Sequence, residues 1–217
     1  MEKQQYTPAL GTHERTADYD KVIAVMTRER RWRGSLLREL SPQTGETIVD
    51  LGSGTGSMAI LIKTKQPDVR MIGIDPDPEV RKIAETKAEK AGIALEFHTA
   101  MGDSEIPSLA SSSADKVISS LVLHQCPIDV KRAIIANAFR LLKPKGRLLI
   151  ADFGKQKGLL MQLLFNQVRA TDGYEDTKPN KDGMIPVYMR EAGFRNVEET
   201  GFTQTPTGTI SLYSGYK

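Results

Sequence analysis

Apolar residues change their spacing repeatedly along the middle of this chain. Short runs rich in β-branched residues, typical of buried strands, alternate with stretches in which apolar residues recur every three or four positions, typical of helices. The expected strands are 47–51, 69–75, 93–98, 116–121 and 146–152, and the helices among them are 55–65, 77–91 and 127–142. This alternation predicts a parallel sheet with helices on both faces and right-handed crossovers.

Both ends of the chain depart from this alternation. Residues 1–12 are polar and are expected to form an arm, and two helices, 14–28 and 31–40, are expected before the sheet. After the fifth strand the sequence predicts an apolar helix, a polar loop, a helix and two strands, at 159–168, 171–183, 185–192, 194–202 and 208–216. A turn around Pro206 joins the last two strands, so they are expected to form an antiparallel hairpin at one edge of the sheet.

The predicted fold class is therefore α/β, a Rossmann-like, doubly wound, mostly parallel seven-stranded sheet with a C-terminal antiparallel hairpin strand. The length of 217 residues suits a single domain, because a chain of this size buries a full core without covalent cross-links. Neither a repeat nor a linker divides the sequence.

Composition excludes several classes of protein. Hydrophobic residues make up 39% and charged residues 26%, as in soluble globular proteins, and the net charge of +3 gives no case for nucleic-acid binding. The basic cluster 28–33 is expected to be a solvated helix face, with a phosphate or headgroup contact as the alternative. One cysteine, Cys126, excludes an internal disulfide, and the three scattered histidines give no metal-binding pattern.

The N-terminal sequence lacks the apolar region of a signal peptide, and no apolar run reaches the length of a membrane span. We therefore expect a cytoplasmic protein without a transmembrane segment.

The stretch 47–58 carries the clearest chemical signal. A β-branched run leads into Asp50, and Gly52, Gly54 and Gly56 follow at alternate positions before a helical pattern begins. A strand, a glycine turn and a helix form a nucleotide site in α/β sheets, because glycine lets the backbone approach the ligand and the helix N-terminus offers free N–H groups. The predicted contacts from this turn are Gly52, Ser53 and Gly54, together with Asp50.

The spacing of the glycines and the position of Asp50 favour a cofactor without phosphate. A dinucleotide-binding turn has the spacing G-x-G-x-x-G, whereas this turn has G-x-G-x-G. A carboxylate at Asp50 would repel a pyrophosphate but would attract a cation. S-adenosylmethionine carries an ammonium and a sulfonium and no phosphate, so the pattern favours this cofactor.

A second carboxylate closes the next strand. Asp75 lies 19 residues after Gly56 and is followed by Pro76, at a distance where it could accept both ribose hydroxyls of an adenosyl group. The alternative is that Asp75 caps the helix 77–91, although Asp77 could serve as that cap instead. Pro76 is included with Asp75 among the predicted cofactor contacts.

Small or polar residues also end the third and fourth strands. Gly102 and Asp103 follow the third strand, and Asp103 could accept from an adenine amino group or could simply lie in a polar loop. Ser120 and Leu121 end the fourth strand. Because ligands bind at the carboxyl ends of the strands in open α/β sheets, these residues are expected to meet the glycine turn there.

In this order the motifs resemble those of the class I S-adenosylmethionine-dependent methyltransferases. The matching stretches are VDLGSGTG (49–56), similar to the first motif, GIDPD (73–77), similar to the ribose-binding motif, and ADKVISSLVLH (114–124), similar to the fourth-strand motif. AFRLLKPKGRLLIADF (138–153) is similar to the motif of the helix and fifth strand, which typically contains LLKPGG in that family. The chain looks most like the small-molecule branch that includes ubiquinone/menaquinone C-methyltransferases and bacterial phospholipid N-methyltransferases. The stretches that carry this second resemblance are YDKV (19–22), REAGFRNVE (190–198) and GTISLYSGYK (208–217).

The resemblance implies methyl transfer from S-adenosylmethionine to a small-molecule acceptor by in-line displacement, with S-adenosylhomocysteine as the product. Within the single domain, 1–217, it implies four parts: an N-terminal helical cap, a cofactor-binding core, a substrate-side insert, and a C-terminal helix with edge strands, at 1–45, 46–154, 155–183 and 184–217. Two alternatives stay open, a protein that binds this cofactor without transfer and, further away, an NAD-dependent oxidoreductase.

Three features bear on the acceptor. His124, four residues after Ser120, is the candidate general base because its ordinary pKa suits proton transfer, and the alternative is a loop histidine bound to backbone. Tyr19 is predicted to cover the methionyl end of the cofactor, or else to pack in the core. The helix 159–168 is apolar nearly all round, which suits the core, a pocket for a hydrophobic or aromatic acceptor, or a contact with a second copy or a membrane surface. A monomer and a homodimer are both compatible with the sequence.

Overall fold

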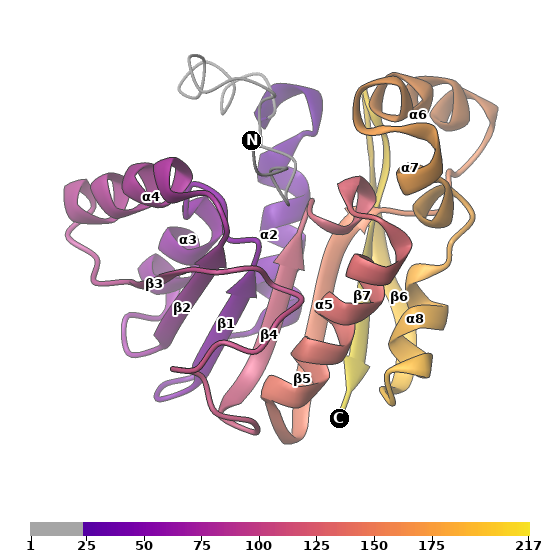
Figure 1. Cartoon of the computed structure of the whole chain (residues 1–217). Coiled ribbons are helices and arrows are strands. Elements are labelled where there is room, and N and C mark those ends of the chain that lie inside the picture. The colour runs from indigo at the N-terminus through magenta and orange to yellow at the C-terminus, as the bar shows by residue number, and fades with distance from the viewer. Residues whose placement is uncertain (1–23) are drawn as a thin grey trace, which may run out of the picture.

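A seven-stranded sheet forms the centre of the computed structural model, which describes residues 24–217 (Figure 1). The strand order is β3-β2-β1-β4-β5-β7-β6. The strands are β1 (Thr47–Leu51), β2 (Arg70–Asp75), β3 (Glu96–Thr99), β4 (Ala114–Ser120), β5 (Leu142–Phe153), β6 (Arg195–Thr205) and β7 (Gly208–Tyr216). The first five pair in parallel, and β7 pairs antiparallel with β5 and with β6. The predicted fold class, including the C-terminal hairpin, is confirmed.

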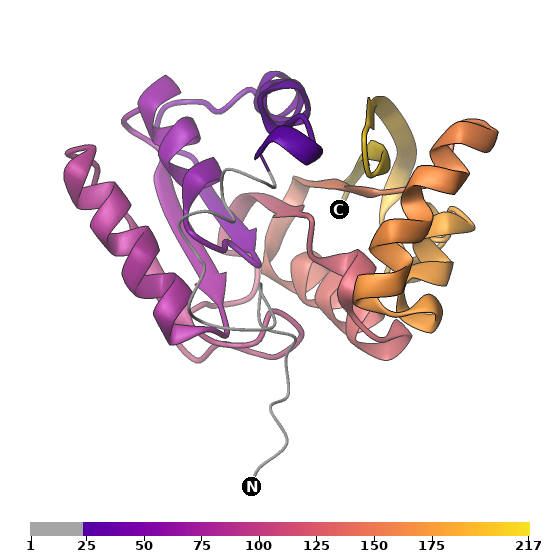
Figure 2. The same cartoon turned by 90° about the horizontal axis from the view of Figure 1, so that it is seen from above.

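Helices cover both faces of the sheet. They are α2 (Glu29–Leu40), α3 (Ser57–Lys65), α4 (Pro78–Lys90), the short 3-10 helix η2 (Leu123–Gln125), α5 (Ile128–Leu141), α6 (Leu159–Asp172), α7 (Tyr174–Lys181) and α8 (Ile185–Glu191). Helices α2 and α3 pack on one face, and α5 and α8 pack on the other. Figures 1 and 2 show α4 towards one end of the sheet and α6 with α7 towards the other, beside the β6–β7 hairpin.

The central strands are buried on both faces, as expected for a parallel sheet between helix layers. In β1, Ile48 packs into the core beneath α2 and α3, whereas Val49 and Leu51 pack into the core beneath α5 and α8. Val117 and Ile118 of β4 divide in the same way. The period of two places successive side chains in opposite cores and leaves the strand ends free to carry polar residues.

The segment 171–183, predicted to be a polar loop, is mostly helical, so this prediction is wrong. Helix α6 continues to Asp172, and α7 follows directly with Pro179 inside it. Glycine, proline and polar residues favour a loop by local propensity, but Thr177, Pro179 and Asn180 are buried against the rest of the fold. Tertiary packing therefore overrides the local preference.

Element boundaries differ elsewhere by a few residues. The third strand begins at Glu96, and β5 begins at Leu142, before the predicted start at 146. The helix predicted at 14–28 lies largely outside the described residues, and the left-handed backbone of Arg28, with φ 50°, separates it from α2. Across residues 24–217, the helices are all too short or too polar to cross a bilayer.

Candidate functional site

Asp50 lies near the carboxyl end of β1, in the middle of the sheet, and is only 1% exposed. Neither of its carboxylate oxygens has a hydrogen-bond partner among the described residues. Burial raises the pKa of Asp50 to about 7, the charge of Arg33 opposes the rise, and the charge of Asp75 adds to it. A buried carboxylate without a partner is costly, and a bound cation would remove that cost.

The glycine turn that follows is fastened to β2 by its own backbone. The N–H groups of Gly52 and Ser53 donate to the carbonyl of Ile74 at 2.8 and 2.9 Å. The N–H of Gly54 donates to Asp75 Oδ2 at 2.9 Å. The turn and both predicted acidic residues thus form one connected unit at the carboxyl ends of β1 and β2.

Two glycines of the turn are needed for different reasons. Gly52 has φ 77°, and a Cβ placed on it would lie 2.2 Å from Val122 Cγ2, so the loop after β4 packs directly on its backbone. Gly54 has φ 52°, but a Cβ there would meet no atom of the described residues within 4 Å. Gly52 therefore allows close packing inside the protein, whereas this packing does not require a glycine at position 54.

Ser53, between these glycines, has a buried hydroxyl with no partner among the described residues. A Cβ on Gly73 of β2 would lie 2.8 Å from Ser53 Oγ, so this side chain turns towards the sheet.

Asp75 is half-buried at the end of β2. Its Oδ1 accepts from the N–H of Asp77 at 3.0 Å, and its Oδ2 accepts from Gly54. Burial raises the pKa of Asp75, and these two backbone hydrogen bonds oppose the rise. The N-cap of α4 is Asp77, whose side chain accepts from the N–H groups of Glu79 and Val80. Asp77, and not Asp75, therefore caps α4.

The remaining predicted contacts lie on the loops after β3 and β4. The carbonyl of Gly102 accepts from Asn137 Nδ2 at 2.9 Å, and a Cβ on Gly102 would approach Leu51 of β1 at 3.7 Å. This places the 102–103 loop beside the end of β1. Asp103 is half-buried, and its Oδ1 accepts from the hydroxyl of Ser104 at 2.8 Å.

Ser120 ends β4 opposite Ala151, and Leu121 follows in a left-handed conformation with φ 54°. Both residues are half-buried. Pro76 is also half-buried, between Asp75 and Asp77. Tyr19 lies outside the described residues, so its role stays a prediction.

His124 lies in a different environment from the glycine turn. Its Nδ1 is 2.8 Å from Asp152 Oδ1, at the end of β5, and its Nε2 is 3.3 Å from Asp172 Oδ2, at the end of α6. Burial acts to lower the pKa of His124, but the charges and hydrogen bonds of the two carboxylates outweigh it and raise the pKa to about 9. We therefore expect the ring to carry a proton on each nitrogen at neutral pH. The role of general base stays a prediction, and this geometry speaks against it at neutral pH.

Asp152 was not among the predicted site residues, yet it is completely buried and holds the loop after β4. Its Oδ2 accepts from the N–H groups of Val122 and Leu123 at 3.0 and 2.7 Å. Its Oδ1 accepts from His124, from its neighbour Phe153 and from Asn180. The same rule that singled out Asp50 and Asp75, a carboxylate at the end of a parallel strand, would have found it.

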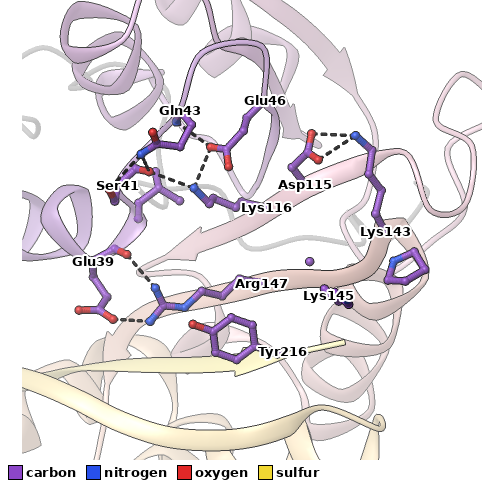
Figure 3. A pocket seen from close by; sticks show the side chains of 13 residues that line it. Glu39, Ser41, Gln43, Glu46, Asp115, Lys116, Lys143, Lys145, Arg147 and Tyr216 are labelled. Atoms are coloured by element: carbon purple, nitrogen blue, oxygen red, sulfur yellow. Dashed lines mark hydrogen bonds and ion pairs between the residues drawn. The ribbon is translucent and has the colours of Figure 1, made fainter.

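A separate cavity of about 430 Å³ lies at the opposite edge of the sheet, where β4 and β5 begin (Figure 3). Its carboxylates are all paired with cations. The pairs are Lys116 with Glu46 at 2.7 Å, Lys143 with Asp115 at 2.8 Å, and Arg147 with Glu39. The Arg147–Glu39 pair ties α2 to β5, and the other two pairs join the starts of the strands, away from the carboxyl ends that carry Asp50 and Asp75. In the described part of the chain, no group of three or more His, Cys, Asp or Glu side chains is arranged so that it could hold a metal ion.

Comparison with known proteins agrees with this arrangement. A family model described as a methyltransferase domain matches residues 42–193. The ubiquinone/menaquinone biosynthesis C-methyltransferase UbiE of Shewanella halifaxensis is 24% identical over 227 residues, which cover 94% of this chain and 88% of the relative. The UbiE protein of Syntrophotalea carbinolica is 26% identical over 206 residues, 86% of this chain and 83% of the relative.

Among solved structures, a SAM dependent methyltransferase from Aquifex aeolicus matches with a TM-score of 0.59 and 19% identity, over 85% of this chain and 87% of the other. At this level of identity the similarity concerns the fold.

Proposed function

The chain belongs to the methyltransferase-domain family, and on that premise we propose that it methylates a hydrophobic ring compound, at a carbon atom, with S-adenosylmethionine as the methyl donor. The reaction class, methyl transfer from this cofactor to a small molecule, follows from the family and from the curated relatives. The ring and the carbon atom are the finer part of the proposal.

One observation carries the assignment of the cofactor. Asp50 is buried at the glycine turn and has no partner for either oxygen among the described residues. A cation without phosphate fits beside it, because an ammonium would satisfy the carboxylate whereas a pyrophosphate would be repelled. The donor set thus fits the amino-acid end of S-adenosylmethionine.

The other predicted residues divide the remaining groups of the cofactor among them. We assign the ribose hydroxyls to Asp75 with Pro76, and the adenine to the loop with Gly102 and Asp103. The turn of Gly52, Ser53 and Gly54 supports the bound molecule from below. Ser120 and Leu121 border it from β4, and Tyr19 keeps its predicted place over the methionyl end.

The cofactor supplies a methyl group that its sulfonium has already activated. The protein must hold the acceptor in line with that group, and positioning of this kind contributes about 7–11 kcal/mol in favourable cases. The residues that border the cofactor therefore act mainly by binding and orienting, and by excluding water from the space beside Gly54.

Two observations support a hydrophobic acceptor. The names of the curated relatives describe methylation of carbon in ubiquinone and menaquinone biosynthesis. In this chain, α6 of the predicted substrate-side insert exposes Leu159, Leu160 and Leu163 while it buries Met161 and Phe165. An insert so rich in apolar side chains suits a ring acceptor better than a charged metabolite.

A labelling experiment tests the acceptor. The protein is incubated with methyl-labelled cofactor and with either the organic or the aqueous fraction of a metabolite extract, and each labelled product is identified by mass spectrometry and NMR. We expect label in the organic fraction, on a ring carbon, and at least tenfold less label with Asp50→Asn. Label on an amine or hydroxyl of a water-soluble product would overturn the proposed acceptor and leave the cofactor assignment intact.

Cytoplasmic placement and a monomeric or homodimeric state stay predictions from the sequence. Light scattering on the purified chain tests the second of these.

A further inference from the structure

The loop after β4 is the junction between the glycine turn and the helices α6 and α7. On one side, Val122 packs against the bare backbone of Gly52, where a Cβ would come within 2.2 Å of Cγ2. On the other side, the segment 172–180 is contacted by His124 of the loop, by Lys131 of α5 and by Phe153 of β5. The loop therefore touches the cofactor side and the predicted acceptor side at once.

The first of these contacts is an unbroken series of side chains. Asp172 Oδ2 lies 3.3 Å from His124 Nε2, and His124 Nδ1 lies 2.8 Å from Asp152 Oδ1. Asp152 Oδ2 then accepts from the N–H groups of Val122 and Leu123. The carboxyl end of α6 is in this way connected, through the buried side chains of His124 and Asp152, to Val122, which packs on Gly52.

Two further contacts join the loop and β5 to α7. The buried Lys131 donates to the carbonyls of Leu123, Cys126 and Asp176, the last at 2.8 Å. Asn180 Nδ2 donates to the carbonyl of Phe153 at 2.9 Å. These contacts hold α7 through a backbone carbonyl and one side-chain amide. The negative charge that the insert places beside His124 is that of Asp172.

The charges in this junction are balanced in a specific way. Asp152 faces His124 from β5 and Asp172 faces it from α6, and Lys131 of α5 donates to carbonyls of the loop and of Asp176 and is attracted by the charge of Asp152. An imidazolium between two carboxylates satisfies both of them, whereas a neutral ring could donate to only one. Loss of either carboxylate would leave a buried charge without its partner.

We propose that Asp172 is a positioning residue for methyl transfer: through His124 and Asp152 it fastens the end of α6 to the loop that packs on Gly52, so that the acceptor side and the cofactor side keep one alignment. This rests on the proposed placement of the acceptor beside the insert. Asp172 itself touches neither the glycine turn nor Asp50 through any contact described above, so it acts through the series and not directly on the cofactor.

The experiment compares the wild-type chain with Asp172→Asn, which removes the charge but keeps the size. Glu175→Gln serves as the matched control, because it removes one charge from an exposed position three residues away. The conservative variant Asp172→Glu keeps the charge and should restore part of the function.

Two readouts need no acceptor. NMR of the ring C–H groups follows the three histidines, with His124→Gln to assign the signal. We expect His124 to titrate about 1 pH unit lower in Asp172→Asn than in the wild type, because an opposite charge at this distance shifts a pKa by about 1–3 units. Hydrogen exchange of the N–H groups of Val122 and Leu123 should become faster in Asp172→Asn and stay unchanged in Glu175→Gln.

The third readout is catalysis. Asp172→Asn should lower kcat about tenfold while the Kd for S-adenosylhomocysteine stays within about twofold, and Glu175→Gln should change neither. An unchanged kcat in Asp172→Asn, or an unshifted titration of His124, would overturn the proposal. If Asp172→Asn shows faster exchange and a shifted titration while the wild type methylates only polar acceptors, the proposed acceptor is overturned and the junction stays in place.

Discussion

Two buried aspartates near the carboxyl ends of parallel strands differ in their hydrogen-bond partners, and this difference distinguishes a candidate binding residue from a structural one. Asp50 near the end of β1 is 1% exposed and has no hydrogen-bond partner among the described residues. Asp152 near the end of β5 is 0% exposed and accepts from three backbone N–H groups, from His124 and from Asn180. Described residues donate to both oxygens of Asp152, whereas none of them donates to Asp50, which we propose receives the ammonium of the cofactor.

The largest expected effect is a difference in stability between variants of the two aspartates. Asp152→Asn removes one partner of a buried charge pair and weakens several hydrogen bonds that Asp152 accepts, so we expect the free energy of unfolding to fall by about 3–5 kcal/mol. Asp50→Asn in the ligand-free protein removes a desolvated charge that no donor among residues 24–217 satisfies, so we expect no loss of stability or a small gain. Urea unfolding of the two variants measures both effects.

Equal losses of stability in these two variants would contradict the distinction, because it requires that only Asp152 is satisfied from within the protein. The same unfolding curves also check that Asp50→Asn folds, which any later binding measurement requires.

The next effect concerns the two glycines of the turn. Alanine at either position must adopt a left-handed backbone, but only Gly52→Ala also drives a Cβ into Val122, which adds about 1–3 kcal/mol of overpacking. Gly54→Ala should instead keep more stability and lose more affinity for S-adenosylhomocysteine. Thermal unfolding and calorimetry on the pair would refute this division if both variants lost stability to the same extent.

The last effect concerns the pH dependence of stability. The pKa of Asp50 is raised from 3.8 to about 7, so the folded state holds its proton more tightly, and stability should fall as pH rises through this window. The pKa of His124 is raised from 6.5 to about 9, so its contribution is complete below pH 6.5 and is lost as pH rises towards 9. Asp50→Asn should remove the first slope and His124→Gln the second.

Urea unfolding at a series of pH values measures these slopes. A wild-type stability that stayed flat from pH 6.5 to 9 would show that His124 is not held as an imidazolium between its two carboxylates.

The sequence predicted the unsatisfied aspartate and missed the satisfied one for physical reasons. The signal of Asp50 is local, since the strand, the carboxylate and the glycines lie within about ten residues of one another. Asp152 has a comparable local signal at the end of a strand, but its partners come from the loop after β4 and from α7. The prediction for His124 placed it near the site but could not supply the two carboxylates that hold its proton.

The insert shows where prediction from sequence ends. Residues 174–181 read YEDTKPNK and have poor helix propensity, yet they form α7. The helix forms because Thr177, Pro179 and Asn180 are buried and because Asn180 and the backbone of Asp176 are hydrogen-bonded to distant segments. Contacts between residues 28 or 45 positions apart leave no periodic pattern in the sequence.

The most direct test of the assignment of S-adenosylmethionine to the site at Asp50 is calorimetry at pH 8. It compares the wild-type chain with Asp50→Asn, each with S-adenosylhomocysteine and with NAD. We expect the wild type to bind S-adenosylhomocysteine and not NAD, and we expect Asp50→Asn to weaken this binding about 10- to 100-fold, because it loses a hydrogen bond to a charged group. Asp103→Asn, on the half-buried loop after β3, should have a smaller effect. Tight binding of NAD would contradict the assignment of the cofactor, and an unchanged affinity for S-adenosylhomocysteine in Asp50→Asn would contradict the binding role of Asp50.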